Sequence, residues 1–442
     1  MRILLVSNGF PPSGQWGTEF YTHQLATGLA ARGHTVQVLC PRRDGEGERF
    51  EVTRTTRYGI RLVEVHNPPA RRKRFADSYR CGAVEDLFEE LVPEFQPDVV
   101  HFLHLFWGLS VRLPAIAKRF GARTMATLTD LGPACHRGQL LDAALSDCDG
   151  PSPAKCARCV RASGPYDGNV VKRRVKGAAA EALSALGGLG LVVTESDLRE
   201  RDREVRAAIG NLDQIVTPTR ALASRLVEAG VLAEVPRVLC YGLDERPFRD
   251  APARVPDGVF RIGFLGQFQP HKGLDTLFQA AARMSRTPMG GVDWELRLHG
   301  NPVGGRHRMY LDRTWDPSLA RRVRFEGPFE PLDAPYAMSE LDAIVVPSTW
   351  LENAPLVVLQ ARVMGVPIVA THVGGIQEVA PKSSRLVPPG DAPALARALT
   401  SLILEAPDRG ASVPLPLGYT AHLETVERLY SGREALRYAV GS

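Results

Sequence analysis

The sequence lacks a strong charge of either sign and any long uninterrupted apolar run. Its 442 residues carry 54 Lys and Arg against 49 Asp and Glu, a net charge of +5. So small an excess does not by itself indicate nucleic-acid binding. The most apolar region, Ala178–Val193, contains Glu181 and three glycines and falls short of a membrane span. The apolar run at 3–6 is too short for the core of a signal peptide. We therefore expect a cytoplasmic protein that binds no nucleic acid.

Cysteine is also scarce, and its arrangement limits the chemistry. There are seven cysteines, and an odd number in a chain without a secretory signal argues for reduced thiols or a metal site over disulfides. Four of them, Cys135, Cys148, Cys156 and Cys159, lie in one stretch rich in Pro, Gly and Asp. The closing C-x-x-C is a half-site for tetrahedral zinc. The stretch predicts either a structural zinc site, which we favour, or four reduced cysteines without metal.

What the sequence does contain is a repeated alternation of short apolar runs and amphipathic segments. Hydrophobic residues make up 44% of the chain, enough for two or three cored domains. The alternation predicts βαβ units and parallel sheets, an α/β fold. The strands expected lie at 3–7, 35–40, 98–103, 123–128, 214–217 and 237–240, and then at 260–265, 294–299, 323–325, 343–346, 366–370 and 384–387.

The stretch 241–258 is rich in Pro, Arg and Asp and is typical of a linker between domains. We therefore expect a first domain over 1–240, with the cysteine-bearing insert at 135–159, and a second over 259–415. A separate helical pattern over 420–439 belongs to a C-terminal segment, 416–442.

The segment Val345–Glu378 is the most informative part of the chain. It predicts a buried strand, a polar loop carrying Glu352, a helix from Pro355 to Met364, a further strand and a glycine turn. A carboxylate and backbone N–H groups would then lie beside a helix N-terminus, at the carboxyl end of a parallel strand. Open α/β sheets bind ligands at this edge, and helix N-termini bind phosphate there.

This segment resembles the donor-site signature of glycosyltransferase family 4, retaining enzymes of the GT-B fold. Glu352 matches the first glutamate of the signature, and Gly374, Gly375 and Glu378 match its closing G-G-x-x-E. Gln360 stands where the family has a second glutamate. The resemblance continues through the interdomain turn at 241–244 and through the donor-phosphate segment around Lys272 and Gly273, where Gln267 replaces the usual arginine.

The resemblance implies two Rossmann-like domains whose parallel sheets face each other across a cleft, with a C-terminal helix that packs back on the first domain. It also implies a nucleoside-diphosphate sugar as donor, bound without a catalytic divalent metal. Lys272 would hold the diphosphate, Glu352 the sugar hydroxyls and Gln360 the ribose. The donor-binding residues implied are Gly17, Gln267, Lys272, Gly273, Glu352, Asn353, Ala354, Gln360, Gly374, Gly375 and Glu378, of which Lys272 and Glu352 would be catalytic.

Several of these residues, and other features of the sequence, also have a simpler interpretation. Lys272 could be a solvated lysine at a helix start, although a cation is electrostatically unfavourable there. Glu352 could serve only the helix dipole. Gly17, with Gly14, could form an ordinary turn between a strand and a helix. Phe329 could stack on the nucleobase or belong to the core. Basic clusters at 71–74 and 172–176 could be solvated faces, or could contact an anionic acceptor or a membrane surface from the cytoplasmic side.

Possible sugar or acceptor contacts follow two strands of the first half. His104 could contact a ligand or be a hydrogen-bonded core residue. Thr129 precedes Asp130 at the position where the family often has a histidine near the 6-hydroxyl of the donor sugar. A threonine hydroxyl can donate one hydrogen bond there but cannot become cationic.

The predicted function is transfer of a sugar, with retention, from a nucleoside-diphosphate donor to an acceptor hydroxyl in polysaccharide, glycolipid or natural-product synthesis. Thr129, Gln267 and Gln360 each replace a charged or titratable family residue. They allow more than one interpretation. The protein could be an active transferase with an altered donor, such as a sugar without the 6-hydroxyl, or a GT-B-fold partner protein that binds nucleotide without catalysing a reaction. A nucleotide-sugar epimerase is a third alternative.

Overall fold

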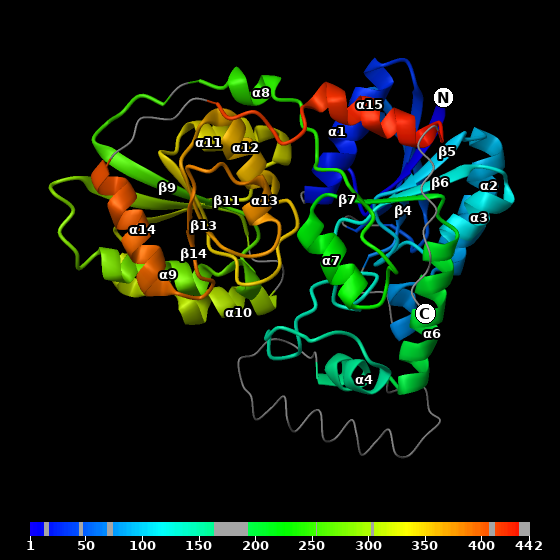
Figure 1. Ribbon diagram of the computed structural model, residues 1–442, viewed down its shortest axis with the longest axis horizontal. Helices are drawn as coiled ribbons and strands as arrows, with labels where there is room; N and C mark the ends of the chain where they lie inside the picture. Colours follow the sequence, from blue (N-terminus) through cyan, green and yellow to red (C-terminus); the bar gives the residue numbers. More distant parts are fainter. Residues whose placement is uncertain are drawn as a thin grey trace.

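The computed structural model describes residues 1–12, 17–43, 47–68, 74–162, 193–252, 254–301, 305–405 and 412–432. Within them the chain forms two separate sheets, each flanked by helices (Figure 1). Strands from residues 2–238 build the first sheet, and strands from residues 259–387 build the second. The two-domain α/β architecture expected from the alternation of apolar runs is therefore observed.

The first sheet has eight strands in the order β3-β4-β2-β1-β5-β6-β7-β8. Its strands are β1 (Arg2–Val6), β2 (Thr35–Arg42), β3 (Val52–Arg57), β4 (Ile60–His66), β5 (Val99–Phe102), β6 (Arg123–Thr127), β7 (Gln214–Thr217) and β8 (Arg237–Val238). All neighbours are parallel except β3 and β4, which form an antiparallel hairpin. The predicted parallel sheet is thus observed, and β3 adds an antiparallel edge strand for which no strand was predicted. The hairpin turn places Tyr58 at φ 50° and Gly59 at φ 75°, as the tight turns that match strand twist require.

The helices of the first half of the chain mostly flank the first sheet (Figure 1). They are α1 (Gly17–Ala31), the 3₁₀ turn η2 (Phe75–Ser78), α2 (Gly82–Phe95), α3 (Leu113–Arg119), α4 (Pro153–Ala162), α6 (Glu195–Gly210) and α7 (Arg220–Glu228). Thr219 caps α7, because its Oγ1 accepts the backbone N–H of Leu222. Helix α4 carries the end of the cysteine-bearing insert and packs on α6, away from the sheet (Figure 1).

The second sheet is parallel throughout, in the order β11-β10-β9-β12-β13-β14. Its strands are β9 (Val259–Leu265), β10 (Asp293–His299), β11 (Val323–Gly327), β12 (Ala343–Val346), β13 (Ile368–Thr371) and β14 (Arg385–Val387). The intervening helices are α8 (Arg246–Arg249), η3 (Pro270–Lys272), α9 (Leu274–Met284), α10 (Gly305–Thr314), η4 (Pro317–Leu319), η5 (Pro331–Asp333), α11 (Ala334–Ser339), α12 (Leu356–Met364), α13 (Ile376–Val379) and α14 (Ala392–Glu405).

The C-terminal helix α15 (Tyr419–Tyr430) leaves the second domain and packs against α1 of the first, as expected (Figure 1). The Tyr21 hydroxyl lies 2.9 Å from His422 Nε2, and Arg32 forms a 2.8 Å ion pair with Glu427. The rest of the predicted helix, 433–439, lies outside the described residues.

The two basic clusters fall largely where the structure gives no description. Residues 71–73 of the first cluster and all of the second, 172–176, lie outside the described residues, so their predicted contact with an anionic acceptor or a membrane stays untested. Arg74, at the edge of the first cluster, is described and largely exposed. No helix in the described ranges is long and apolar enough to cross a bilayer.

Candidate functional site

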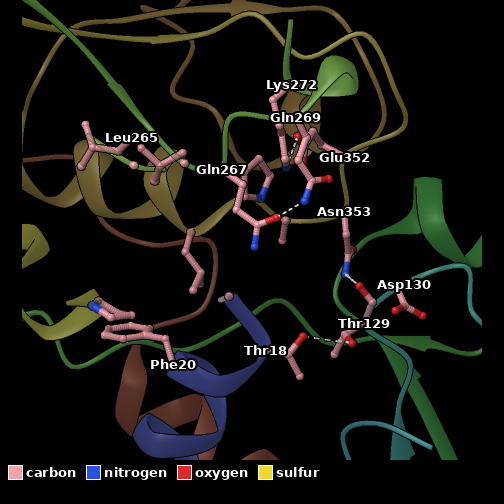
Figure 2. A pocket seen from close by; sticks show the side chains of 18 of the residues that line it. Thr18, Phe20, Thr129, Asp130, Leu265, Gln267, Gln269, Lys272, Glu352 and Asn353 are labelled. Carbon is pink, nitrogen blue, oxygen red and sulfur yellow. Dashed lines mark hydrogen bonds and ion pairs between the residues drawn. The ribbon is translucent and has the colours of Figure 1, made fainter. Parts of the chain in front are cut away.

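A cavity of about 470 Å³ is lined by residues from both domains. The first domain contributes the start of α1 and the loops that follow β5 and β6, and the second contributes the loops that follow β9 and β12. Figure 2 shows Thr18 and Thr129 on one side of this space and Gln267, Lys272 and Glu352 on the other. The carboxyl ends of two parallel sheets therefore meet at one site, the place where α/β folds bind ligands.

Local sequence explains why the loop after β12 carries its polar groups into the cavity. Pro347 follows the buried strand directly, and Pro355 occupies the N-cap position of α12. The polar loop between them contains Glu352. Gly365 ends α12 at φ 66°, the left-handed conformation in which glycine is favoured. The loop is thus fixed at both ends by residues whose backbone preferences suit these positions.

Lys272 and Glu352 form the central charged pair of the cavity. Lys272 Nζ lies 2.7 Å from Glu352 Oε1 (Figure 2). The Lys272 side chain is 25% exposed and that of Glu352 is 7% exposed, so the lysine lies on the solvent side of the pair. Lys272 ends the turn η3, and Gly273 follows it at φ 75°. A Cβ at Gly273 would lie 1.9 Å from Pro347 O, so the two loops can approach only with glycine there.

The Glu352 carboxylate accepts several hydrogen bonds at one oxygen. Oε1 lies 2.7 Å from Lys272 Nζ, 2.5 Å from Ser348 Oγ and 2.9 Å from Trp350 Nε1. Burial opposes ionisation of this carboxyl, but the Lys272 charge and the three donors outweigh it, so the pKa of Glu352 lies below its ordinary value. Glu352 is therefore an anion at neutral pH.

The first domain supplies a second polar cluster, at the ends of β5 and β6. The backbone N–H of Phe106 donates to His104 Nδ1 at 3.1 Å, which leaves His104 Nε2 to donate to Asp130 Oδ2 at 3.3 Å. Thr18 Oγ1 donates to Thr129 Oγ1, which itself donates to Leu103 O, both at 3.3 Å. His104, Thr129 and Asp130 all line the cavity, but the His104 side chain is only 4% exposed. Its observed role is to hold Asp130.

Asn353 connects the loop after β12 to the first domain. Its side-chain NH₂ donates to Thr129 O at 3.0 Å, and its Oδ1 accepts the Thr219 hydroxyl at 2.9 Å. Because both ends of the amide are used, the Asn353 side chain fixes the relative positions of the two domains at the cavity.

The predicted donor residues divide into two groups. Those that line the cavity are Gly17, Gln267, Lys272, Glu352, Asn353, Ala354 and Gln360. Gly273, Gly374, Gly375 and Glu378 do not line it. The two glycines of the G-G-x-x-E turn support the loop from behind. A Cβ would lie 2.2 Å from Glu352 O at Gly374 and 1.9 Å from Asn353 O at Gly375.

Glu378 lies at the domain interface. Its two carboxylate oxygens accept the backbone N–H groups of Arg220 and Ala221 at 2.8 and 2.7 Å. These amides belong to the first turn of α7, where a helix has unpaired donors and favours a negative charge. Glu378 therefore caps a helix of the other domain.

Several cavity residues were absent from the sequence-based prediction. Trp350 and His271 come from the second domain, and Arg137, Gly138 and Gln139 come from the start of the cysteine-bearing insert. Gln139 Nε2 lies 3.4 Å from His271 Nε2, so the insert reaches the second domain. Nothing in the sequence pairs residue 139 with residue 271.

The cysteines of the insert lie near one another. Burial raises the pKa of the Cys156 thiol, and the neighbouring thiols of Cys135, Cys159 and Cys148 raise it further. In the described part of the chain, however, no group of three or more His, Cys, Asp or Glu is placed to hold a metal ion. The structure lends the zinc site no support, and zinc remains a prediction from the C-x-x-C spacing.

Comparison with known proteins identifies both halves. Residues 17–164 match the family described as "Glycosyl transferase 4-like domain", and residues 259–405 match "Glycosyl transferases group 1". The D-inositol 3-phosphate glycosyltransferase of Salinispora tropica is 29% identical over 302 residues, 60% of this chain and 62% of that protein. The enzyme of the same name from Corynebacterium diphtheriae is 32% identical over 199 residues, 41% and 46% of the two chains. The chain thus spans less than two thirds of these relatives.

Longer similarities are more distant. The glycogen synthase of Mycobacterium tuberculosis is 24% identical over 420 residues, 91% of this chain and 86% of that one. Among solved structures, sucrose-phosphate synthase from Thermosynechococcus elongatus aligns with a TM-score of 0.61 at 18% identity, covering 98% and 95% of the two chains. HepE of Anabaena in complex with UDP-glucose aligns at 0.58 and 16%, covering 98% and 100%. These structural similarities show the GT-B fold, and with the two family matches they establish that the chain belongs to glycosyltransferase family 4.

Proposed function

We propose that this chain transfers a sugar from a nucleoside-diphosphate donor to an acceptor hydroxyl with retention of anomeric configuration. The observation that carries the proposal is the pairing of Lys272 with Glu352 in a cavity lined by both domains. One cation and one anion, 2.7 Å apart, match a ligand that carries a diphosphate at one end and neutral hydroxyls beside it.

Each residue has a physical task in this reaction. The bond between the anomeric carbon and the β-phosphate oxygen breaks, and the acceptor oxygen forms the new bond to that carbon. The negative charge that grows on the leaving phosphate needs a fixed cation, which Lys272 provides. The acceptor proton passes to the leaving phosphate. Glu352 accepts hydrogen bonds from the donor sugar, and the Gln360 amide meets the ribose hydroxyls.

The nucleotide end is the better supported part of the proposal. Gln267, Lys272 and Gln360 lie along the second-domain wall of the cavity, and relatives solved with UDP and UDP-glucose share the fold. The neutral Gln267 leaves Lys272 as the one family cation of this segment. We therefore expect diphosphate affinity to depend strongly on Lys272.

A donor screen by calorimetry tests the proposal. Purified protein is titrated with UDP, GDP and ADP and with their glucose conjugates, alongside Lys272→Ala and Glu352→Ala. We expect one base to bind, Lys272→Ala to abolish the diphosphate response, and Glu352→Ala to remove the discrimination between a nucleotide and its sugar conjugate. Turnover with a hydroxyl acceptor then separates a transferase from an epimerase, which consumes donor alone.

A binding protein without catalysis is the second candidate, because Thr129, Gln267 and Gln360 are neutral at positions where the family has charged or titratable groups. The Thr129 hydroxyl is already engaged by Thr18 and Leu103 O. Nucleotide binding without hydrolysis or transfer, across a panel of hexose, pentose and 6-deoxy donors, would favour this candidate over the transferase.

A further inference from the structure

Trp350 touches both members of the charged pair, although neither the spacing nor the family signature selects it. Its indole N–H donates to Glu352 Oε1 at 2.9 Å. The Lys272 ammonium lies 5.3 Å from the centre of the same ring, within the range of a cation–π contact. One side chain thus hydrogen-bonds the anion with its polar edge and faces the cation with its π system.

The indole is itself held in place by its surroundings. The His271 ring meets it edge-on at a centroid distance of 4.9 Å and an interplanar angle of 70°. The adjacent Thr349 donates its backbone N–H to His271 O at 2.9 Å. The turn η3 and the loop after β12 are therefore joined on both sides of Trp350. An aromatic ring fixed in this way loses little entropy when a ligand binds.

The hydrogen bonds at Glu352 are unevenly shared between its two oxygens. Oε1 meets Lys272, Ser348 and Trp350, which exceeds the two lone pairs of one carboxylate oxygen. Within the described residues, no hydrogen bond to Oε2 is recorded, and Glu352 lines the cavity. Glu352 can therefore accept a hydrogen bond from a ligand hydroxyl only at Oε2.

We propose that Trp350 is a positioning residue that sets the sugar selectivity of the donor site. It fixes Oε1 through its N–H, so that Oε2 is presented to a sugar hydroxyl. Its ring also keeps the Lys272 ammonium beside Glu352, with the remaining N–H donors directed to phosphate. The ligand class is a nucleotide whose terminal phosphate bears a polyhydroxylated ring. This inference rests on the proposed function, because it assigns a task within the same site.

Two substitutions separate the two contacts of the indole. Trp350→Phe keeps an aromatic face for Lys272 and removes the N–H donor, whereas Trp350→Leu removes both. Trp315→Phe is the matched control, because Trp315 packs against Phe278 and Phe325 in the same domain and does not line the cavity. Thermal melting of each variant confirms that it folds before binding is measured.

Calorimetry gives the ratio that decides between the outcomes: the affinity for the glucose conjugate divided by the affinity for the nucleoside diphosphate. The base is the one that the wild-type protein binds. We expect Trp350→Phe to weaken binding of the glucose conjugate about tenfold, which is the effect of losing one hydrogen bond to a charged group. The affinity for the diphosphate alone should change by less than about twofold. Trp350→Leu should also weaken binding of the diphosphate, by about fivefold, because the cation–π contact is lost. Trp315→Phe should leave both affinities at the wild-type value.

Equal weakening of the diphosphate and its glucose conjugate by Trp350→Phe would overturn the inference, because the indole would then act on the loop as a whole. Unchanged binding of both ligands would overturn it too. Failure of the proposed function gives a different result, since the wild-type protein would then bind none of UDP, GDP, ADP or their glucose conjugates.

Discussion

The Nζ of Lys272 lies 2.7 Å from Oε1 of Glu352, although the two residues belong to loops that follow different strands of the second sheet. The pair holds η3 against the loop after β12, and both loops line the cavity. Removal of one member leaves the other partly desolvated and without its counter-charge, which costs more than an exposed ion pair contributes. Breaking the pair should therefore lower the free energy of unfolding as well as the affinity for the donor.

A double-mutant cycle checks this coupling. We expect Lys272→Met to lower the free energy of unfolding by about 2 kcal/mol, because Glu352 is buried. Lys272→Met combined with Glu352→Gln should cost less than the sum of the single changes, with a coupling of about 1 kcal/mol or more. Urea unfolding supplies the values. The exposed pair Arg54–Glu94 is the control and should show a coupling below about 1 kcal/mol. Additive costs at the first pair would contradict the expectation.

Glu378 should act through the domain interface. Glu378→Ala removes two hydrogen bonds and a negative charge from the first turn of α7, so we expect a loss of about 1 kcal/mol in unfolding free energy. Gln377→Ala, on the same short helix and also exposed, should change stability by less than about 0.5 kcal/mol. A tenfold loss of nucleotide affinity at unchanged stability would instead support the donor-binding role implied by the family signature.

Gly375 should be intolerant of any side chain. A Cβ there would lie 1.9 Å from Asn353 O and 2.5 Å from Thr219 Cγ2, so Gly375→Ala must displace the loop after β12 or the first domain. We expect a loss of about 1–3 kcal/mol in unfolding free energy and weaker nucleotide-sugar binding. Gly418→Ala is the matched control, because a Cβ at Gly418 meets nothing within 4 Å. Wild-type sugar binding by Gly375→Ala would show that the loop can shift without loss.

The sequence predicted correctly those helices and strands whose own residues carry a clear pattern. The helix expected from Pro355 to Met364 matches α12 to within one residue, and the expected strand at 343–346 coincides with β12, because each combines a clear apolar pattern with a stop signal. The hairpin of β3 and β4 was not predicted. Apart from Val52, β3 carries only Thr and Arg on both of its faces, so its apolar signal is weak. Its turn residues are Tyr58-Gly59, where Asn-Gly would be a stronger signal.

Within the site, the sequence could identify residues but not their partners. Lys272, Glu352 and Gln360 were selected by a signature and do line the cavity. The helix that Glu378 caps, the pairing of His104 with Asp130 and the approach of Gln139 to His271 depend on how the domains pack. Such contacts join residues 26 to 158 positions apart, and no local pattern specifies them.

Stability should fall as the pH is lowered below neutrality, because two histidines are buried where α15 meets the first domain: His101 of β5 and His422 of α15 itself. Burial lowers the pKa of His101 to about 3 and that of His422 to about 4, against about 6.5 in an unfolded chain. Below pH 6.5 the unfolded chain therefore binds protons that the folded chain excludes, and the loss ends near the folded pKa values. His422→Gln should reduce the difference in unfolding free energy between pH 7.5 and pH 5 by about 2 kcal/mol.

Urea unfolding at the two pH values measures this difference. His372→Gln serves as the control because His372 is exposed, and its pH dependence should follow that of the wild type. An unchanged difference in His422→Gln would show that His422 carries little of the acid sensitivity.

The neutral Gln267 should limit affinity for the diphosphate. Gln267 lines the cavity and accepts a hydrogen bond from Gln269, so it offers an amide where the family has a cation. We expect Gln267→Arg to tighten binding of the nucleoside diphosphate about fivefold, because a guanidinium can pair with phosphate oxygens. The gain should shrink as salt is raised from 50 to 500 mM. Gln269→Arg, two positions further along the same loop, tests whether any added cation suffices. Equal gains from both variants would mean that charge alone, and not its place at 267, governs binding of the diphosphate.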